Sequence, residues 1–123
     1  DSEAVTLWTD ADRLTQVFIN LISNAQKYCD AAHPEMVVSV RQMPGRIQVD
    51  FADNGSGIPT RQQALIFEKF ARADTARGAP GAGLGLAISR EIMIRLGGGL
   101  SYVPSEQGTR FRVRLPLRVR RAA

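Results

Sequence analysis

The sequence predicts an α+β fold, a two-layer α/β sandwich in which helices cover one face of a sheet. Two segments carry apolar residues at helical spacing, and two others alternate apolar and polar residues as half-buried strands do. The expected strands also come in pairs with short connections, which favours hairpins over parallel crossovers. We therefore expect a single domain over residues 1–123, with a mixed, mostly antiparallel sheet of about five strands and three helices on one face.

The first long helix is expected to begin at Thr9 or Asp10 and to run to about residue 32, after a short strand at residues 4–8. Either residue suits the N-cap, and Pro34 lies just beyond the expected end as a stop signal. The apolar stripe of this helix follows the i, i+3, i+4, i+7 spacing. Its members are Leu14, Val17, Phe18, Leu21, Ile22 and Ala25.

A second stripe on the same helix is polar and consists of Asn20, Asn24 and Lys27. At about 100° per residue this stripe lies beside the apolar one, not opposite to it. Polar groups in that place border the core, either at the rim of a cleft or on an ordinary boundary face. The helix by itself is consistent with both interpretations.

The remaining elements follow in order: strands near 36–42 and 46–53, a helix from Thr60 towards Phe67, a loop over 71–83, a helix over 84–97, and strands near 100–104 and 108–116. Pro44 and Gly45 suit a type II turn between the first two of these strands. The later helix has a stripe of its own, and three glycines from Gly97 end it. That stripe consists of Gly85, Ile88, Ser89, Ile92, Met93 and Leu96.

Asp53 is the anomaly of the second hairpin strand, because its position matches the inward parity of the apolar residues before it. Those residues are Ile47, Val49 and Phe51. A carboxylate that points towards the apolar side is costly unless protein or ligand donors pair with it. Gly55 and Gly57 follow at once and permit positive φ or a close approach of a ligand. The alternative is a turn that ends the strand, and we favour a site.

The last strand repeats the alternation, with Phe111, Val113 and Leu115 facing in and Arg110, Arg112 and Arg114 facing out. Thr109 shares the inward parity at the start of this strand. Its hydroxyl is therefore a candidate to complete the same polar spot as Asp53, or it is simply a β-favouring residue.

The composition is that of a soluble globular domain, with 44% hydrophobic and 23% charged residues and a net charge of +4. No apolar run approaches the roughly 18 residues of a membrane span, and we expect no signal peptide. The single cysteine, Cys29, excludes an internal disulfide and fits a reducing compartment. We interpret the arginines near the C-terminus as a solvated strand face, although a basic tail also suits nucleic acid or a membrane surface. The chain starts at Asp1 without methionine, so we expect it to be a piece of a larger protein.

The glycine-rich run from Gly81 to Gly85 opens a helix, as many phosphate-binding loops do. It does not fit the dinucleotide fingerprint, because the last glycine position is Leu86 or Ile88. The P-loop sequence is also absent, and no Cys/His cluster has the spacing of a metal site. His33, the only histidine, reads as a surface loop residue.

Taken together, these stretches resemble the catalytic and ATP-binding domain of bacterial two-component sensor histidine kinases, in the GHKL superfamily with DNA gyrase and mismatch-repair ATPases. "DRLTQVFINLISNAQKY" is similar to the N box and "DNGSGIP" to the G1 box. "IFEKFARAD" is similar to the F box, "GAGLGLAISREI" to the G2 box and "EQGTRFRVRLP" to the closing strands. Each stretch alone is weak evidence, but four boxes in order are specific. The resemblance implies the Bergerat ATP-binding fold.

The resemblance also implies roles for the matching residues. Asn24 and Asn20 would hold Mg²⁺, Lys27 would reach the phosphates of ATP, and Arg72 would lie near the γ-phosphate. Tyr28 would pack against the adenine. Asp53 would accept a hydrogen bond from the adenine amino group, with help from Thr109. The remaining positions would shape the pocket wall, the lid and the phosphate-facing helix start: Gly55, Gly57, Ile58, Phe67, Phe70, Gly81, Gly83, Leu84, Gly85 and Leu86.

One position separates branches of this superfamily. Hydrolysing members resemble E-x-x-x-N, in which the glutamate activates water, and here that place is Asn20. Without a carboxylate base, attack by water is expected to be slow, so ATP can wait for a histidine nucleophile. His33 matches no phosphoacceptor motif, so the chain looks like the catalytic domain alone.

The implied partners are an upstream dimerisation and phosphoacceptor domain and a downstream response regulator. The expected location is the cytoplasm, and we expect this domain to be soluble and monomeric. The resemblance allows the longer parent protein to be homodimeric and anchored in the inner membrane. A regulatory nucleotide-binding module without catalysis is the rival hypothesis. We expect no nucleic-acid partner, because the outward arginines lack interleaved exposed aromatics.

Overall fold

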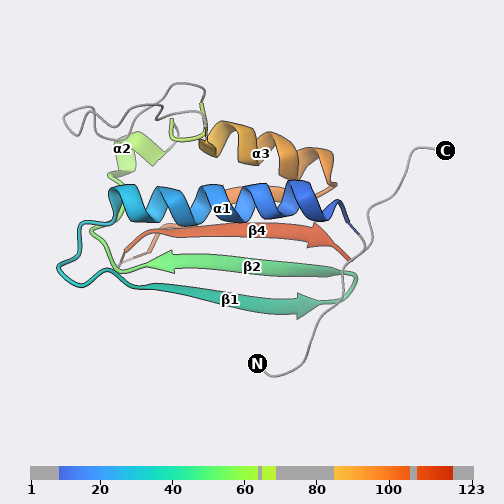
Figure 1. The fold of residues 1–123 in the computed structure, drawn as a ribbon, viewed down its shortest axis with the longest axis horizontal. Helices are drawn as coiled ribbons and strands as arrows, with labels where there is room; N and C mark the ends of the chain where they lie inside the picture. Colours follow the sequence, from blue (N-terminus) through green and yellow to red (C-terminus); the bar gives the residue numbers. More distant parts are fainter. Residues whose placement is uncertain (1–8, 64, 69–84, 106–107, 118–123) are drawn as a thin grey trace.

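The computed structural model describes residues 9–63, 65–68, 85–105 and 108–117 of the chain. These residues form two layers, in which α1 and α3 lie over the same face of a four-stranded sheet (Figure 1). The strand order is β1-β2-β4-β3, and every neighbouring pair is antiparallel. The predicted α+β sandwich is confirmed. The strand expected at residues 4–8 lies outside the described residues, so four strands are seen where about five were expected.

Helix α1 covers Ala11–Tyr28, and its N-cap is Asp10, whose side chain accepts a hydrogen bond from the backbone N–H of Arg13 at 3.1 Å. The predicted end near residue 32 is wrong, because Cys29 already has an extended backbone. The residues after it instead make hydrogen bonds to the loop that follows β2. Within the described part of the chain, no helix has the length and apolar character needed to cross a membrane.

Strands β1 (Met36–Met43) and β2 (Arg46–Asp53) form the predicted hairpin, and Gly45 has the positive φ of 75° that its turn requires. The helix expected from Thr60 is the single turn α2 (Thr60–Gln63). Helix α3 covers Gly85–Arg95 and ends two residues earlier than predicted. Its end is a Schellman motif, in which Gly97 has φ 87° and Gly98 donates to the carbonyl of Met93 at 2.9 Å.

Strands β3 (Gly99–Tyr102) and β4 (Arg110–Pro116) complete the sheet, and β4 pairs with both β2 and β3. The core lies between the helices and the inner sheet face. It contains the residues predicted from the α1 stripe, the α3 stripe and the alternating strands: Leu14, Val17, Leu21, Ile47, Val49, Phe51, Ile92, Met93, Leu96, Phe111, Val113 and Leu115. Ile22 and Ile88 do not belong to it, since they remain 41% and 40% exposed.

Asp50 lies on the outer sheet face, as the alternation predicts, yet it is only 5% exposed. Two arginines of β4 cover it. Arg112 makes two hydrogen bonds to its carboxylate, at 3.0 and 3.1 Å, and Arg110 makes one at 2.8 Å. Burial alone raises the pKa of Asp50, but the hydrogen bonds and charges of Arg112 and Arg110 outweigh burial and hold that pKa below its usual range.

Asp50→Asn is expected to lower the free energy of unfolding by about 1–3 kcal/mol at pH 7, because charged hydrogen bonds are lost. Since folding lowers the pKa of Asp50, its contribution is complete above the unfolded value of about 3.9 and disappears as the pH falls through the folded value. Urea unfolding of both proteins at pH 7 and at pH 2–3 measures this. The matched control is Glu91→Gln, which removes an exposed ion pair with Arg95 and should cost at most about 0.5 kcal/mol. If Asp50→Asn lost the same free energy of unfolding at both pH values, the stabilising role of the charged Asp50 carboxylate would be contradicted.

Candidate active site

The side chain of Asp53, the last residue of β2, is held in a fixed orientation by two backbone N–H groups that lie next to it. Its Oδ1 accepts hydrogen bonds from the backbone N–H groups of Gly55 at 2.9 Å and Thr109 at 3.3 Å. The N–H of Asp53 donates in turn to the carbonyl of Thr109 at 2.8 Å. Within the described ranges, neither Oδ2 of Asp53 nor the hydroxyl of Thr109 has a partner. The structure therefore brings the two predicted residues together and leaves a carboxylate oxygen ready to accept from a ligand.

The glycines of the loop after β2 are needed for close packing. Gly57 has φ 87°, and a Cβ there would lie 2.9 Å from the carbonyl oxygen of Gly108. A Cβ on Gly55 would lie 3.0 Å from a carboxylate oxygen of Asp30 and 3.2 Å from one of Asp53. At both glycines, therefore, it is other atoms of the protein that approach the backbone closely.

A set of contacts that the sequence did not reveal ties the chain after α1 to this loop. Asp30 accepts from the backbone N–H of Ser56 at 2.8 Å and from its hydroxyl at 2.6 Å. The side chain of Asn54 accepts from the N–H of Glu35 at 2.9 Å and donates to the carbonyl of His33 at 2.9 Å. Asp30 and Asn54 are common turn residues, which is the only signal that the sequence offered.

The polar stripe of α1 leaves ligand groups unused. Lys27 is exposed, and neither Lys27 nor Asn24 has a side-chain hydrogen bond or ion pair in the part of the chain that the structure describes. The Nδ2 group of Asn20 donates to the hydroxyl of Ser89 at 3.0 Å and to the carbonyl of Gly85 at 3.4 Å. The stripe is therefore partly a boundary between α1 and α3 and partly an open polar surface.

The donor set fits Mg²⁺. A carbonyl oxygen can only accept, so the contact with Gly85 identifies the NH₂ group as the side of the Asn20 amide that faces α3. The amide oxygens of Asn20 and Asn24 are then unused by described residues, and Mg²⁺ prefers oxygen ligands. The described residues contain no cluster of three His, Cys, Asp or Glu side chains suited to a metal. Two amide oxygens suit a cation that brings water and phosphate ligands with it.

These groups come from elements that meet at one end of the sandwich. Figure 1 shows that the C-terminal ends of α1 and β2 lie at the same end of the domain, and that α3 begins towards that end. The N-terminal turn of α3 starts at Gly85 and presents a helix terminus there. A positive helix end, a lysine, two amides and a carboxylate acceptor together suit an anionic ligand that also carries a hydrogen-bond donor.

The other predicted site residues fall into two groups. Phe67 packs edge-on against Phe111 at 6.0 Å between ring centroids, and the Arg90 guanidinium lies 5.1 Å from the Phe67 centroid. Ile58 and Leu86 are partly buried against the core, and Tyr28 is half-buried at the end of α1. The rest lie outside the described residues: Phe70, Arg72, Gly81, Gly83 and Leu84.

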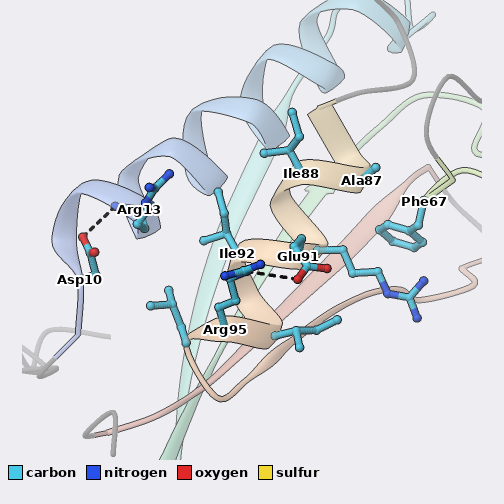
Figure 2. A pocket seen from close by; sticks show the side chains of 11 residues that line it. Asp10, Arg13, Phe67, Ala87, Ile88, Glu91, Ile92 and Arg95 are labelled. Atoms are coloured by element: carbon cyan, nitrogen blue, oxygen red, sulfur yellow. Dashed lines mark hydrogen bonds and ion pairs between the residues drawn. The ribbon is translucent and has the colours of Figure 1, made fainter. Parts of the chain in front are cut away.

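A groove lies elsewhere, between the start of α1 and the outer side of α3. Figure 2 shows Asp10 and Arg13 on one wall and Glu91 and Arg95 on the other, with Ile92 between them. Among the predicted site residues that the structure describes, only Phe67 lines it. The groove is therefore distinct from the site formed around Asp53 and Asn24.

The fold and these residues together define a two-layer α/β sandwich domain with a polar site at one end. Residues 9–119 match the model of the histidine kinase-, DNA gyrase B- and HSP90-like ATPases. The chain belongs to this family, which confirms the resemblance read from the four boxes.

The chain is similar to sensor proteins of two-component systems, among them a histidine-protein kinase. The chain is 39% identical over 103 residues to the signal transduction histidine-protein kinase/phosphatase MprB of Mycobacterium leprae, covering 83% of this chain and 20% of that protein. It is 41% identical over 108 residues to the sensor protein KdpD of Escherichia coli, covering 87% and 12%. The chain thus spans a small part of each relative.

Solved structures that resemble this chain are also histidine kinases. A mycobacterial sensor histidine kinase MprB structure superposes with a TM-score of 0.76 at 31% identity, covering 91% of this chain and 81% of that one. The catalytic domain of histidine kinase ThkA gives a TM-score of 0.76 at 29% identity, covering 89% and 70%.

Proposed function

We propose that this chain is the catalytic and ATP-binding domain of a two-component sensor histidine kinase. It binds Mg-ATP, and the γ-phosphoryl group passes to a histidine on a separate helical dimerisation domain. The observation that carries the proposal is Asp53, whose Oδ1 is held by two backbone N–H groups while Oδ2 is left to accept from a ligand amino group. Family membership makes ATP the nucleotide.

We propose a task for each of these groups. Asp53 accepts from the adenine amino group, with Thr109 beside it, and Tyr28 packs against the base. The amide oxygens of Asn20 and Asn24 hold Mg²⁺, which neutralises phosphate charge when it is bound. Lys27 is unpaired among described residues and reaches the phosphates. We also assign a role at the γ-phosphate to Arg72, which is outside the described residues. Phosphoryl transfer depends mainly on positioning and charge stabilisation, so these groups suffice without a covalent intermediate.

Because residue 20 is an asparagine and carries no carboxylate, the γ-phosphoryl group passes to a protein acceptor in preference to water. An amide is no general base, so it does not activate water for attack on the γ-phosphate. The acceptor histidine supplies the nucleophile instead. We therefore propose that the isolated domain binds ATP with little turnover, and that its longer protein works as a homodimer with a response regulator. The unpaired Cys29 is consistent with the cytoplasm as its location.

The test is formation of phosphohistidine in the longer protein that contains the acceptor domain. With Mg²⁺ and ATP labelled at the γ-phosphate, the label should enter the protein as an acid-labile, base-stable phosphate, and Asp53→Asn should remove most of it. Nucleotide binding without any labelled histidine would contradict the kinase proposal and support a regulatory binding module. Glu91→Gln, which changes the separate groove of Figure 2, is the control and should label normally.

A further inference from the structure

Ser89 is a buried polar residue of α3 that contacts α1. Its exposed fraction is 0%, and it lies among the buried residues of α3 next to Ile92 and Met93. Its hydroxyl accepts a hydrogen bond from Nδ2 of Asn20 at 3.0 Å. Alanine would fill this position with better helix propensity and without a polar atom to bury. The hydroxyl therefore has a use other than packing.

That use is visible in the orientation of the Asn20 amide. Its NH₂ group has two acceptors on α3, the Ser89 hydroxyl and the more distant carbonyl of Gly85 at 3.4 Å. Because these acceptors hold the nitrogen, the oxygen occupies the opposite corner of the amide and is left unused by described residues. Without the nearer acceptor, only the longer contact would keep the amide from rotating.

We propose that Ser89 is a positioning residue for the metal site, acting through Asn20. It holds the Asn20 oxygen ready for Mg²⁺ and joins that cation to the first turn of α3. This inference rests on the proposed function, in which Asn20 is a metal ligand. Partners in the outer shell of a metal site orient the ligand and raise its donor strength.

The same hydrogen bond couples two events at the site. A cation on the Asn20 oxygen draws electrons from the amide and makes its N–H a stronger donor to Ser89 and Gly85. Binding of the cation and attachment of the α3 start to α1 therefore favour each other, and such coupling is reciprocal. Loss of the Ser89 hydroxyl must then weaken the part of nucleotide affinity that depends on Mg²⁺.

Calorimetry of wild type and Ser89→Ala with ATP tests this, once with Mg²⁺ and once with EDTA. In wild type, Mg²⁺ should tighten ATP binding. In Ser89→Ala, affinity with Mg²⁺ should fall about 10-fold, the lower end of the range for outer-shell partners, and affinity in EDTA should change less than about 2-fold. Ser101→Ala, which removes a hydroxyl from β3, is the control and should leave both affinities unchanged.

The outcomes separate this inference from the proposed function. If Mg²⁺ tightens binding equally in wild type and in Ser89→Ala, or if the variant loses affinity equally with and without Mg²⁺, the positioning role is wrong and the proposed function stands. If wild type binds no ATP, the proposed function itself fails.

A second measurement does not depend on the variant. In wild type with ATP bound, addition of Mg²⁺ should shift the NMR signals of the Asn20 side-chain NH₂ group and slow its hydrogen exchange. Unchanged signals would overturn the coupling.

Discussion

Asp53→Asn is expected to weaken the binding of Mg-ATP by about 100-fold or more, since a charged hydrogen bond and its geometry are both lost. The geometry makes asparagine a poor substitute. Both partners of Oδ1 are N–H donors, from Gly55 and Thr109, so an asparagine must keep its oxygen at that place. Its NH₂ group then occupies the place of Oδ2 and meets the adenine amino group, donor against donor.

Calorimetry with ATP and with inosine triphosphate checks this reasoning. Inosine carries a carbonyl where adenine carries the amino group, so the variant should bind inosine triphosphate more tightly than ATP. Asp50→Asn is the matched control, because it makes the same change on the outer face of the same strand. It should lower stability and leave ATP affinity unchanged. Wild-type affinity for ATP in Asp53→Asn would show that the base does not bind at this carboxylate.

Gly108→Ala is expected to lower the free energy of unfolding by at least about 3 kcal/mol, beyond the cost of about 1–2 kcal/mol for a left-handed residue with a Cβ. Gly108 has φ 74°, and its Cβ would lie 1.8 Å from the carbonyl oxygen of Asp53. The strands must separate there, and with them the Asp53–Thr109 contact, so ATP affinity should fall as well.

Gly45→Ala is the control for the backbone conformation alone. Gly45 has a similar φ of 75°, but a Cβ there would meet nothing within 4 Å. It should cost only about 1–2 kcal/mol in urea unfolding and leave ATP affinity intact. Equal losses of unfolding free energy for Gly108→Ala and Gly45→Ala would mean that the clash with the Asp53 carbonyl does not lower stability.

Local patterns predicted most of the fold because each pattern reports on one element. Alternation identified the buried faces of β2 and β4, and the apolar stripes identified the core sides of α1 and α3. The errors came from tertiary structure. Ile22 and Ile88 fit their stripes, but both remain exposed, so the packed face of each helix is narrower than its apolar stripe. The end of α1 at Tyr28 is set by contacts of the following residues with a loop far away in sequence.

The site was predictable where parity or a motif pointed to it. Asp53 and Thr109 share the inward parity of their strands, and the structure joins them. The contacts that hold the site in place could not be predicted, because they connect polar residues from separate elements. Ser56 with Asp30 and Ser89 with Asn20 are such pairs, and no local pattern indicates which distant residue a serine meets.

The most direct test of the proposed site is an NMR titration of the chain with Mg-ATP. We expect backbone and side-chain signals to shift at the end of α1, around Asn24 and Lys27, and at the end of β2, from Asp53 to Gly57. Signals from the groove of Figure 2, such as Arg13 and Glu91, should stay in place. Shifts confined to that groove, or no shifts at saturating nucleotide, would contradict ATP binding at the Asp53 site.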